Sequence, residues 1–356
     1  MEADSDYGRF CIAENFHLLF TSQRMISIVV YGRNDNHGYN MHKRRALSLN
    51  CMAAVLSDPM DEILFVDFNT PDDFPTFPEA IRDTLTPAAR KRLRILRVRP
   101  SVHAKYQPRT HLAVVEPVAR NVAVRRSNPA NRWILSSNTD MIFTPREGGS
   151  LSELVRDLPP GYYGIPRFEL PESLWESLDR NQPEVVISTV AEWGWKFHLN
   201  EIVRGVDVIK FDAPGDFQLV ERADLFKIHG FNEEMLRGWH VDSNLSKRLS
   251  FLHGGVSDLS LAVFGYHCGH TRLMTPNHSP VKVEDKFFEF VHMVTAPDLS
   301  EQAETWGLAQ EEIEEVRLDG EAATFSAILK ELAGPHIEKA IEVSVIWLAI
   351  LAQTRS

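Results

Sequence analysis

The stretch RWILSSNTDMIFTP, residues 132–145, places one acidic side chain, Asp140, inside an otherwise apolar run. Residues 132–137 are typical of a buried strand, and the apolar run resumes after Asp140. A carboxylate at such a position is costly to bury unless it meets a cation or hydrogen-bond donors. A divalent metal ion would satisfy it. Read alone, the tripeptide 138–140 also fits a simple Asx-type turn. The choice between a turn and a metal ligand therefore depends on the surrounding sequence.

Segments typical of strands and helices alternate around this stretch. The sequence predicts helices at 40–56 and 112–126, and strands at 25–31, 62–73, 92–98 and 132–137. The strand at 92–98 alternates polar and apolar residues, so we expect it to be more exposed than the others. This order indicates an α/β fold with an open, mostly parallel sheet flanked by helices.

Polar turns follow three of these strands, at Gly32–Gly38, Asp67–Asp72 and Asn138–Asp140. In open α/β sheets, ligands bind at the carboxyl ends of the strands. We therefore expect the three turns to lie along one rim. Residues 159–215, rich in Pro, Gly and aromatic side chains, are expected to form a long functional insertion of loops and short helices.

The chain is expected to divide into an N-terminal extension (1–24), a main domain (25–280) and a C-terminal helical extension (281–356). The C-terminal extension contains the acidic segment AQEEIEEVR, residues 309–317, and the apolar segment AIEVSVIWLAILAQ, residues 340–353. The apolar segment is too short to span a bilayer. It is expected to pack on the main domain, on a subunit partner or on the membrane surface.

The composition excludes several classes of protein. The chain has 356 residues, 44% of them apolar, and a formal charge of -11, which argues against nucleic acid as a partner. The N-terminus MEADSDYGRF has no apolar stretch typical of a secretory signal, and no window has the roughly 18 apolar residues of a spanning helix. Three widely spaced cysteines fit a reducing compartment. We expect a cytoplasmic protein, with peripheral contact at the inner face of the membrane as an alternative.

Two histidines near the end of the main domain are further ligand candidates. The segment YHCGHTRL, residues 266–273, contains His267 and His270, and imidazole with carboxylate is a common way to hold Mn²⁺. One alternative is half of a zinc site with Cys268, although its remaining ligands would have to be isolated residues such as Cys11 or Cys51. A plain core histidine is the alternative for one of the two.

Asp242 lies just after Trp239, at the start of a helical pattern. It could cap the helix at its N-terminus, which is the structural interpretation. The functional interpretation is a general base, because a partly desolvated carboxylate can accept a proton from an attacking hydroxyl.

Several stretches together resemble one family, the nucleotide-sugar glycosyltransferases of the GT-A fold, family-2-like. The resemblance covers roughly residues 25–275 and rests on four segments in order: DEILFVDFNTPDD (61–73), ARNVAVRRSNPANRWILSSNTDMIFTP (119–145), GDFQLVERADLFKIHGFNEEMLRGWHVDSNLSKRL (215–249) and HCGHTR (267–272).

The resemblance implies a set of site residues. It places Asn138 and Asp140 at the metal-binding D-x-D, His270 as a further metal ligand and Asp242 as the catalytic base. It implies a nucleotide site that includes Tyr31, Asp67, Asn121, Arg125 and Arg272. In this site Tyr31 and Asp67 lie near the base, and Arg125 or Arg272 binds phosphate oxygens, with an ordinary surface arginine as the alternative for each.

The implied activity is that of a hexosyltransferase-like enzyme dependent on Mn²⁺ or Mg²⁺. It would move a sugar from a nucleoside diphosphate donor to a hydroxyl acceptor such as a glycan or glycolipid, with inversion, as in polysaccharide biosynthesis. The chain departs from the family pattern at Asn138, where the first acid of D-x-D is expected, and at Val241, where a Glu precedes the base. The alternatives are a retaining transferase and a catalytically silent sugar-nucleotide or glycan-binding protein.

Overall fold

The computed structural model describes residues 25–35, 40–199, 214–238, 240–270 and 304–319. The helices and strands described below all belong to one compact unit, residues 1–317. The predicted N-terminal extension and the apolar segment 340–353 lie outside the described residues. Their proposed roles, and the domain boundaries drawn from the sequence, therefore stay predictions.

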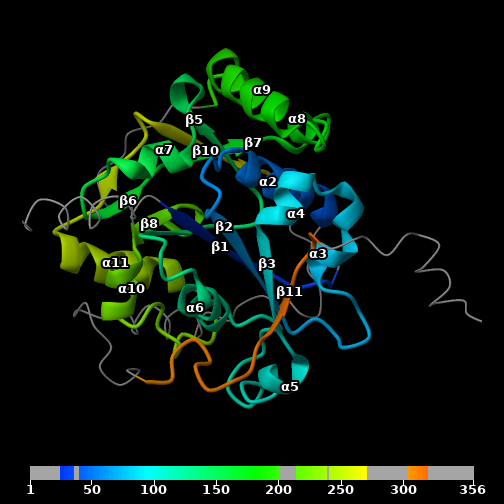
Figure 1. The fold of residues 1–356 in the computed structure, drawn as a ribbon, viewed down its shortest axis with the longest axis vertical. Helices are drawn as coiled ribbons and strands as arrows, with labels where there is room; N and C mark the ends of the chain where they lie inside the picture. Colours follow the sequence, from blue (N-terminus) through cyan, green and yellow to red (C-terminus); the bar gives the residue numbers. More distant parts are fainter. Residues whose placement is uncertain (1–24, 36–39, 200–213, 239, 271–303, 320–356) are drawn as a thin grey trace, which may run out of the picture. The chain divides into compact units, whose positions relative to one another are not determined.

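An eight-stranded sheet lies at the centre of this unit, with strand order β11-β3-β2-β1-β4-β8-β6-β9 (Figure 1). In that order the strands are Glu314–Val316, Leu93–Val98, Glu62–Phe68, Ile26–Gly32, Trp133–Ser136, Gln218–Glu221, Tyr162–Gly164 and Ser257–Asp258. Only β8 and β11 run against the other strands of this sheet. The predicted open, mostly parallel α/β sheet is confirmed.

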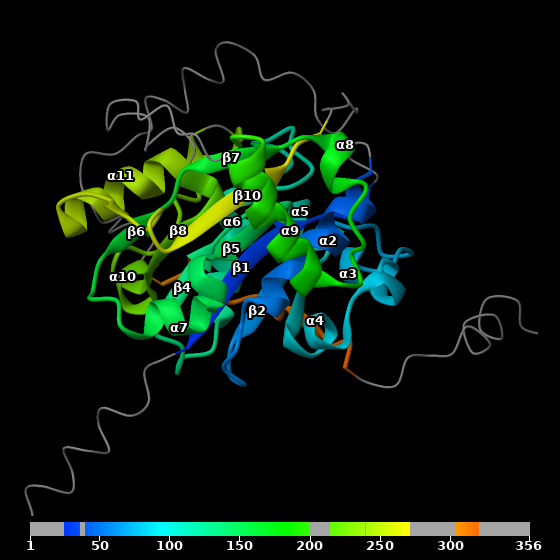
Figure 2. The same cartoon turned by 90° about the horizontal axis from the view of Figure 1, so that it is seen from above.

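A second, three-stranded sheet has the order β5-β10-β7, where β5 is Met141–Pro145, β10 is Val263–Cys268 and β7 is Arg167–Leu170. Strand β10 pairs antiparallel with β5 and parallel with β7. Figure 2 shows β10, in yellow, beside β7. Because only residues 137–140 separate β4 from β5, this small sheet begins where a strand of the large sheet ends.

Helices pack against both sheets and supply the core. The longer helices are α2 (Met41–Ala54), α6 (Glu116–Arg126), α9 (Pro183–Lys196) and α11 (Val241–His253); the shorter ones are α3 (Phe77–Ala80), α4 (Pro87–Arg92), α5 (Pro100–His103), α7 (Leu151–Arg156), α8 (Glu172–Trp175) and α10 (Arg222–Lys227). Helix α6 packs on β1, β2 and β3, whereas α2 packs on β5 and α9. Pro117 is tolerated in α6 because it lies in the first turn, where its missing N–H would have no helical partner. No helix within the described ranges is long and apolar enough to cross a membrane.

Two predictions at one edge of the large sheet are wrong. Strand β3 is buried except at Arg94, with α6 packed on its face and β11 paired along its edge. The segment 309–317, predicted as helix, contains β11 instead. Its Glu315 and Glu314 form ion pairs with Arg94 and Arg99, more than 200 positions away. Local charge patterning cannot show such distant partners.

The expected insertion of loops and short helices at 159–215 is also different in the structure. Its described part contains β6, β7 and the 14-residue helix α9. Both strands join sheets through partners distant in sequence, so their short apolar runs gave little local signal. Residues 200–213 lie outside the described part of the chain.

Candidate metal centre and active site

The carboxyl ends of β1, β2 and β4 meet at one edge of the large sheet. Strand β1 lies between the other two and is parallel to both. The turns that follow these strands therefore begin side by side. The predicted rim is confirmed for the described residues of the three turns.

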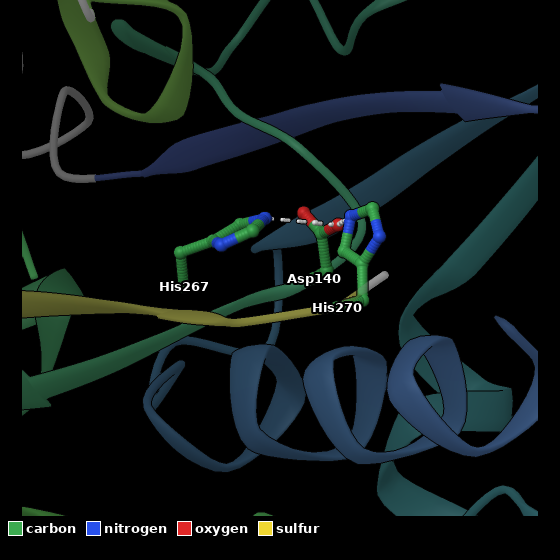
Figure 3. A group of neighbouring side chains, drawn as sticks. All are labelled: Asp140, His267 and His270. Carbon is green, nitrogen blue, oxygen red and sulfur yellow. Dashed lines mark ion pairs between the residues drawn. The ribbon is translucent and has the colours of Figure 1, made fainter. Parts of the chain in front are cut away.

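Asp140 lies at this rim with both predicted histidines (Figure 3). Its Oδ2 is 3.3 Å from Nε2 of His267 and 3.5 Å from Nε2 of His270. One ligand atom from each of the three residues lies within 4.8 Å of the others. The structure thus brings together Asp140 and His270, which the resemblance implies as metal ligands, and His267, the other histidine candidate from the sequence.

The pairing of β5 with β10 produces this convergence. Met141, the first residue of β5, is opposite His267, and the Cys268 N–H donates to the Asp140 carbonyl oxygen at 2.8 Å. Asp140 is therefore held at the end of β10, beside the histidine of that strand. His270 follows two residues beyond the strand and reaches the same carboxylate.

The cluster is strongly coupled electrostatically. Burial alone would raise the pKa of Asp140, but hydrogen bonds from His267 and His270, with Arg44 at 3.9 Å, hold it far below its ordinary value. Burial opposes charge on His267 as well, yet the Asp140 and Glu169 carboxylates raise its pKa to about 9. Without a metal, Asp140 is therefore ionised and His267 is protonated. A metal ion would replace that proton.

The residues fit a divalent metal ion. Ligand atoms about 2.1 Å from one ion lie roughly 3.0 to 3.5 Å apart, and the two distances at Asp140 fall within or close to this range. Two imidazoles with one carboxylate favour Mn²⁺ over Mg²⁺, which prefers all-oxygen sites. The alternative zinc site through Cys268 is not favoured, because Cys51 and Cys268 are buried free thiols outside this ligand group.

Asn138 occupies the first position of the predicted D-x-D, and its side chain contacts Arg120 and Asp216. Its Oδ1 accepts a hydrogen bond from Arg120 at 2.8 Å, and its Nδ2 donates to Asp216 at 2.7 Å. The other oxygen of Asp216 lies 3.2 Å from Arg167. An amide at position 138 can satisfy both a cation and an anion at once, whereas a carboxylate there would repel Asp216.

Arg120 and Asp216 are site residues that the sequence interpretation missed. Arg120 is buried, and it donates to Glu116, Ser136 and the Ser137 carbonyl as well as to Asn138. Both residues lie inside stretches that carry the family resemblance, Arg120 beside Asn121 and Asp216 after Gly215. That adjacency was the only available signal, because neither residue stands out by local pattern.

Asp242 lies in the first turn of α11, where its carboxylate is partly desolvated. The N-cap alternative is wrong, because His240 occupies that position. The Asp242 Oδ2 accepts from the Gly215 N–H at 3.2 Å, and Oδ1 accepts from the Ser243 N–H at 2.8 Å. Burial, followed by the nearby charge of Glu116, raises the Asp242 pKa to about 6. Such a group is ionised near neutral pH and still basic enough to accept a proton.

The structure describes four of the five residues implied in the nucleotide site, and each contacts a different part of the protein. Tyr31, at the end of β1, stacks on the Arg120 guanidinium at 4.9 Å and so joins the network around Asn138. Asp67 is fully buried and accepts a hydrogen bond from the Phe77 N–H at 2.8 Å.

Asn121 and Arg125, also implied in the nucleotide site, are engaged by other residues of the protein. The Asn121 amide binds Phe231 and Glu233, and the Arg125 guanidinium lies over the Trp306 ring. Arg272 lies outside the described residues. Nucleotide contacts by these residues stay predictions.

Asn121→Ala is expected to destabilise the fold by roughly 2 to 3 kcal/mol, because it leaves buried backbone and carboxylate partners unpaired. Asn121 donates to the Phe231 carbonyl and to Glu233, and accepts from the Phe231 N–H. Urea unfolding compares the variant with wild type and with Asn181→Ala, an exposed control. A midpoint unchanged from wild type would show that the buried amide has no structural role.

Comparisons with known proteins give a distant structural likeness. No protein-family model matches the sequence, and no curated protein matches it. TarS 1-349 of S. aureus in complex with UDP-GlcNAc is 14% identical, with a TM-score of 0.47; the match covers 80% of this chain and 71% of that one. Mannosyltransferase PcManGT of Pyrobaculum calidifontis, in complex with GDP-Man and Mn²⁺, is 13% identical, with a TM-score of 0.44 and coverage of 93% and 82%.

Two other matches span less than two thirds of the matched protein. This chain covers 60% of TarS 1-349 in one further structure and 37% of the TarS chain in another, with a TM-score of 0.42 in each. Such identities and TM-scores leave the activity of this chain open. Its fold class rests on the sheet topology described above.

Proposed function

We propose that this protein is a metal-dependent glycosyltransferase that moves a sugar from a nucleoside diphosphate donor to a hydroxyl acceptor with inversion. The observation that carries the proposal is the convergence of Asp140, His267 and His270 at the rim of the parallel strands. The four segments that resemble the family supply the donor class. Asp242, the proposed base, is linked to this rim by Gly215, because the adjacent Asp216 binds Asn138.

The donor would lie across the strand ends with its base near Tyr31 and Asp67. Asp140, His267 and His270 would hold the metal ion, which supplies positive charge against the departing diphosphate. Asp242 would accept the proton of the acceptor hydroxyl. The hydroxyl oxygen then attacks the anomeric carbon as the bond to the diphosphate breaks on the opposite face, which inverts the configuration.

The proposed acceptor is a hydroxyl of a glycan or glycolipid. Val241 is buried at 2% exposure beside the proposed base, so an acidic acceptor contact at that position is replaced by a core residue. Acceptor binding must therefore use other groups. Cytoplasmic location and a membrane or subunit contact through 340–353 stay predictions.

A donor screen tests the proposal. UDP, GDP and CDP sugars are compared by thermal shift with and without Mn²⁺, because a ligand that binds only the native protein raises its melting temperature. The donor that binds is then supplied with glycan acceptors, and NMR determines the product anomer. Metal-dependent binding followed by inverted product supports the proposal. Retained configuration, or binding without turnover under every condition, contradicts it.

The transfer rate is expected to rise with pH through a midpoint near 6 and to level off at higher pH. The raised pKa of Asp242, about 6, means that the base is protonated and inactive below this value. The measurement is a pH profile of kcat/KM between pH 5 and 8 at saturating Mn²⁺. Glu116→Gln should move the midpoint to lower pH, because it removes a negative charge that raises this pKa. A flat profile across the range would contradict the base assignment.

A further inference from the structure

Glu169 contacts the ring nitrogen of His267 that lies on the side away from Asp140. Its Oε2 lies 2.8 Å from Nδ1 of His267. Strands β7 and β10 are parallel neighbours, and Glu169 is directly opposite His267 in their register. The three-stranded sheet therefore places His267 between Glu169 on β7 and Asp140, the residue just before β5.

The Glu169 carboxylate is itself held from both sides. Arg167, on the same face of β7, donates to its Oε1 through Nε at 2.7 Å. Nη1 of Arg167 lies 3.2 Å from Asp216, which also binds Asn138. The position of Glu169 is thus tied to the buried network beside the metal ligands.

The Glu169 carboxylate and the Arg167 guanidinium both lie at Nδ1 of His267, 2.8 and 3.1 Å away, and the carboxylate favours a proton on that nitrogen. When Nδ1 carries the proton and donates it to Glu169, the lone pair of Nε2 points toward Asp140. Metal-binding histidines commonly donate their second ring N–H to a carboxylate, which fixes the tautomer and the ring orientation. A histidine that only fills the core needs no such arrangement of carboxylates on both nitrogens.

We propose that Glu169 is a positioning residue of the metal centre, which orients His267 as a third protein ligand beside Asp140 and His270. This inference rests on the metal-dependent function proposed above. It gives a specific role to a residue that lies outside the motifs of the sequence.

The competing interpretation is a simple ion-pair network in which Glu169 only balances charge. The side chain of Glu169 is 56% exposed, and exposed ion pairs contribute little to stability. A role limited to charge balance therefore predicts a small change in melting temperature and the same metal affinity in Glu169→Gln as in Glu169→Ala, because both variants lose the same negative charge. A positioning role predicts a change in metal affinity of about 10- to 100-fold.

The test is the affinity for Mn²⁺ alone, measured by EPR titration of the full chain at one fixed pH. Glu169→Ala is expected to weaken binding at least about tenfold. Glu169→Gln should weaken it less, because its amide oxygen still accepts the Nδ1 proton. Glu314→Gln is the matched control, since Glu314 is a half-exposed strand carboxylate paired with Arg99 at the far edge of the large sheet. The control should bind like wild type.

The outcomes separate the two proposals. If wild type binds Mn²⁺ and both Glu169 variants bind it equally well, the positioning role is overturned and the metal centre stands. If wild type itself fails to bind Mn²⁺, the metal centre is overturned together with this inference. Graded weakening in the order wild type, Gln, Ala, with an unchanged control, supports the inference. Both variants are checked for folding by their melting temperature in the absence of metal.

Discussion

Asp242→Asn is expected to abolish sugar transfer while the affinity for the donor stays within about twofold of wild type. The amide has the same shape but cannot accept the proton of the acceptor hydroxyl, and general base catalysis contributes roughly 10²- to 10⁴-fold to a rate. The measurement is kcat for transfer together with the donor Kd. Turnover at the wild-type rate would refute the base assignment.

The stability of the same variant provides an independent check. Asp242 has a pKa of about 6 in the folded chain, above its ordinary value of 3.8. The folded state therefore binds this proton more tightly than the unfolded state. The stabilising effect of the bound proton is lost as pH rises through about 6. At pH 8 the neutral Asn variant should be at least as stable as wild type. Asp224→Asn, in the first turn of α10, is the control for a general helix effect.

Asp140→Ala is expected to remove Mn²⁺ binding and to lower transfer at least about 100-fold, because the metal stabilises the departing diphosphate. Asp140 is the only carboxylate of the described ligand group, and both histidines face its Oδ2. The measurement is the rise in melting temperature with added Mn²⁺, which should be present in wild type and absent in the variant.

Asp140→Asn separates loss of charge from loss of shape. Its amide retains one oxygen ligand, so Mn²⁺ binding should be weakened and not abolished. A full Mn²⁺ shift in the Ala variant would show that the ion binds elsewhere.

Local patterns were sufficient for adjacent strands in the middle of the large sheet and for two long helices. Apolar runs and amphipathic spacing identified β1, β2, β4, α2 and α6, because each of these elements is buried on faces that its own residues define. The interruption at Asp140 gave a correct position for the rim, since the carboxyl ends of parallel strands must meet at one edge.

The rest depends on partners that are distant in the sequence. Strand β11 forms from an acidic segment that pairs with β3, where Arg94 and Arg99 meet its carboxylates. The pairing of Asn138 with Arg120 and Asp216 joins three separate segments. The sequence left His267 undecided between ligand and core residue, because only the register of β10 with β5 and β7 places it between two carboxylates.

Pulsed EPR of Mn²⁺ bound to wild type with a nucleoside diphosphate tests the central claim most directly. UDP, GDP and CDP are each added to the protein with substoichiometric Mn²⁺. The account predicts ¹⁴N couplings from coordinated imidazole and a ³¹P coupling from the diphosphate on the same ion, with the ¹⁴N couplings reduced in His267→Ala and in His270→Ala. A spectrum of hydrated Mn²⁺ without nitrogen coupling under all three conditions would contradict it.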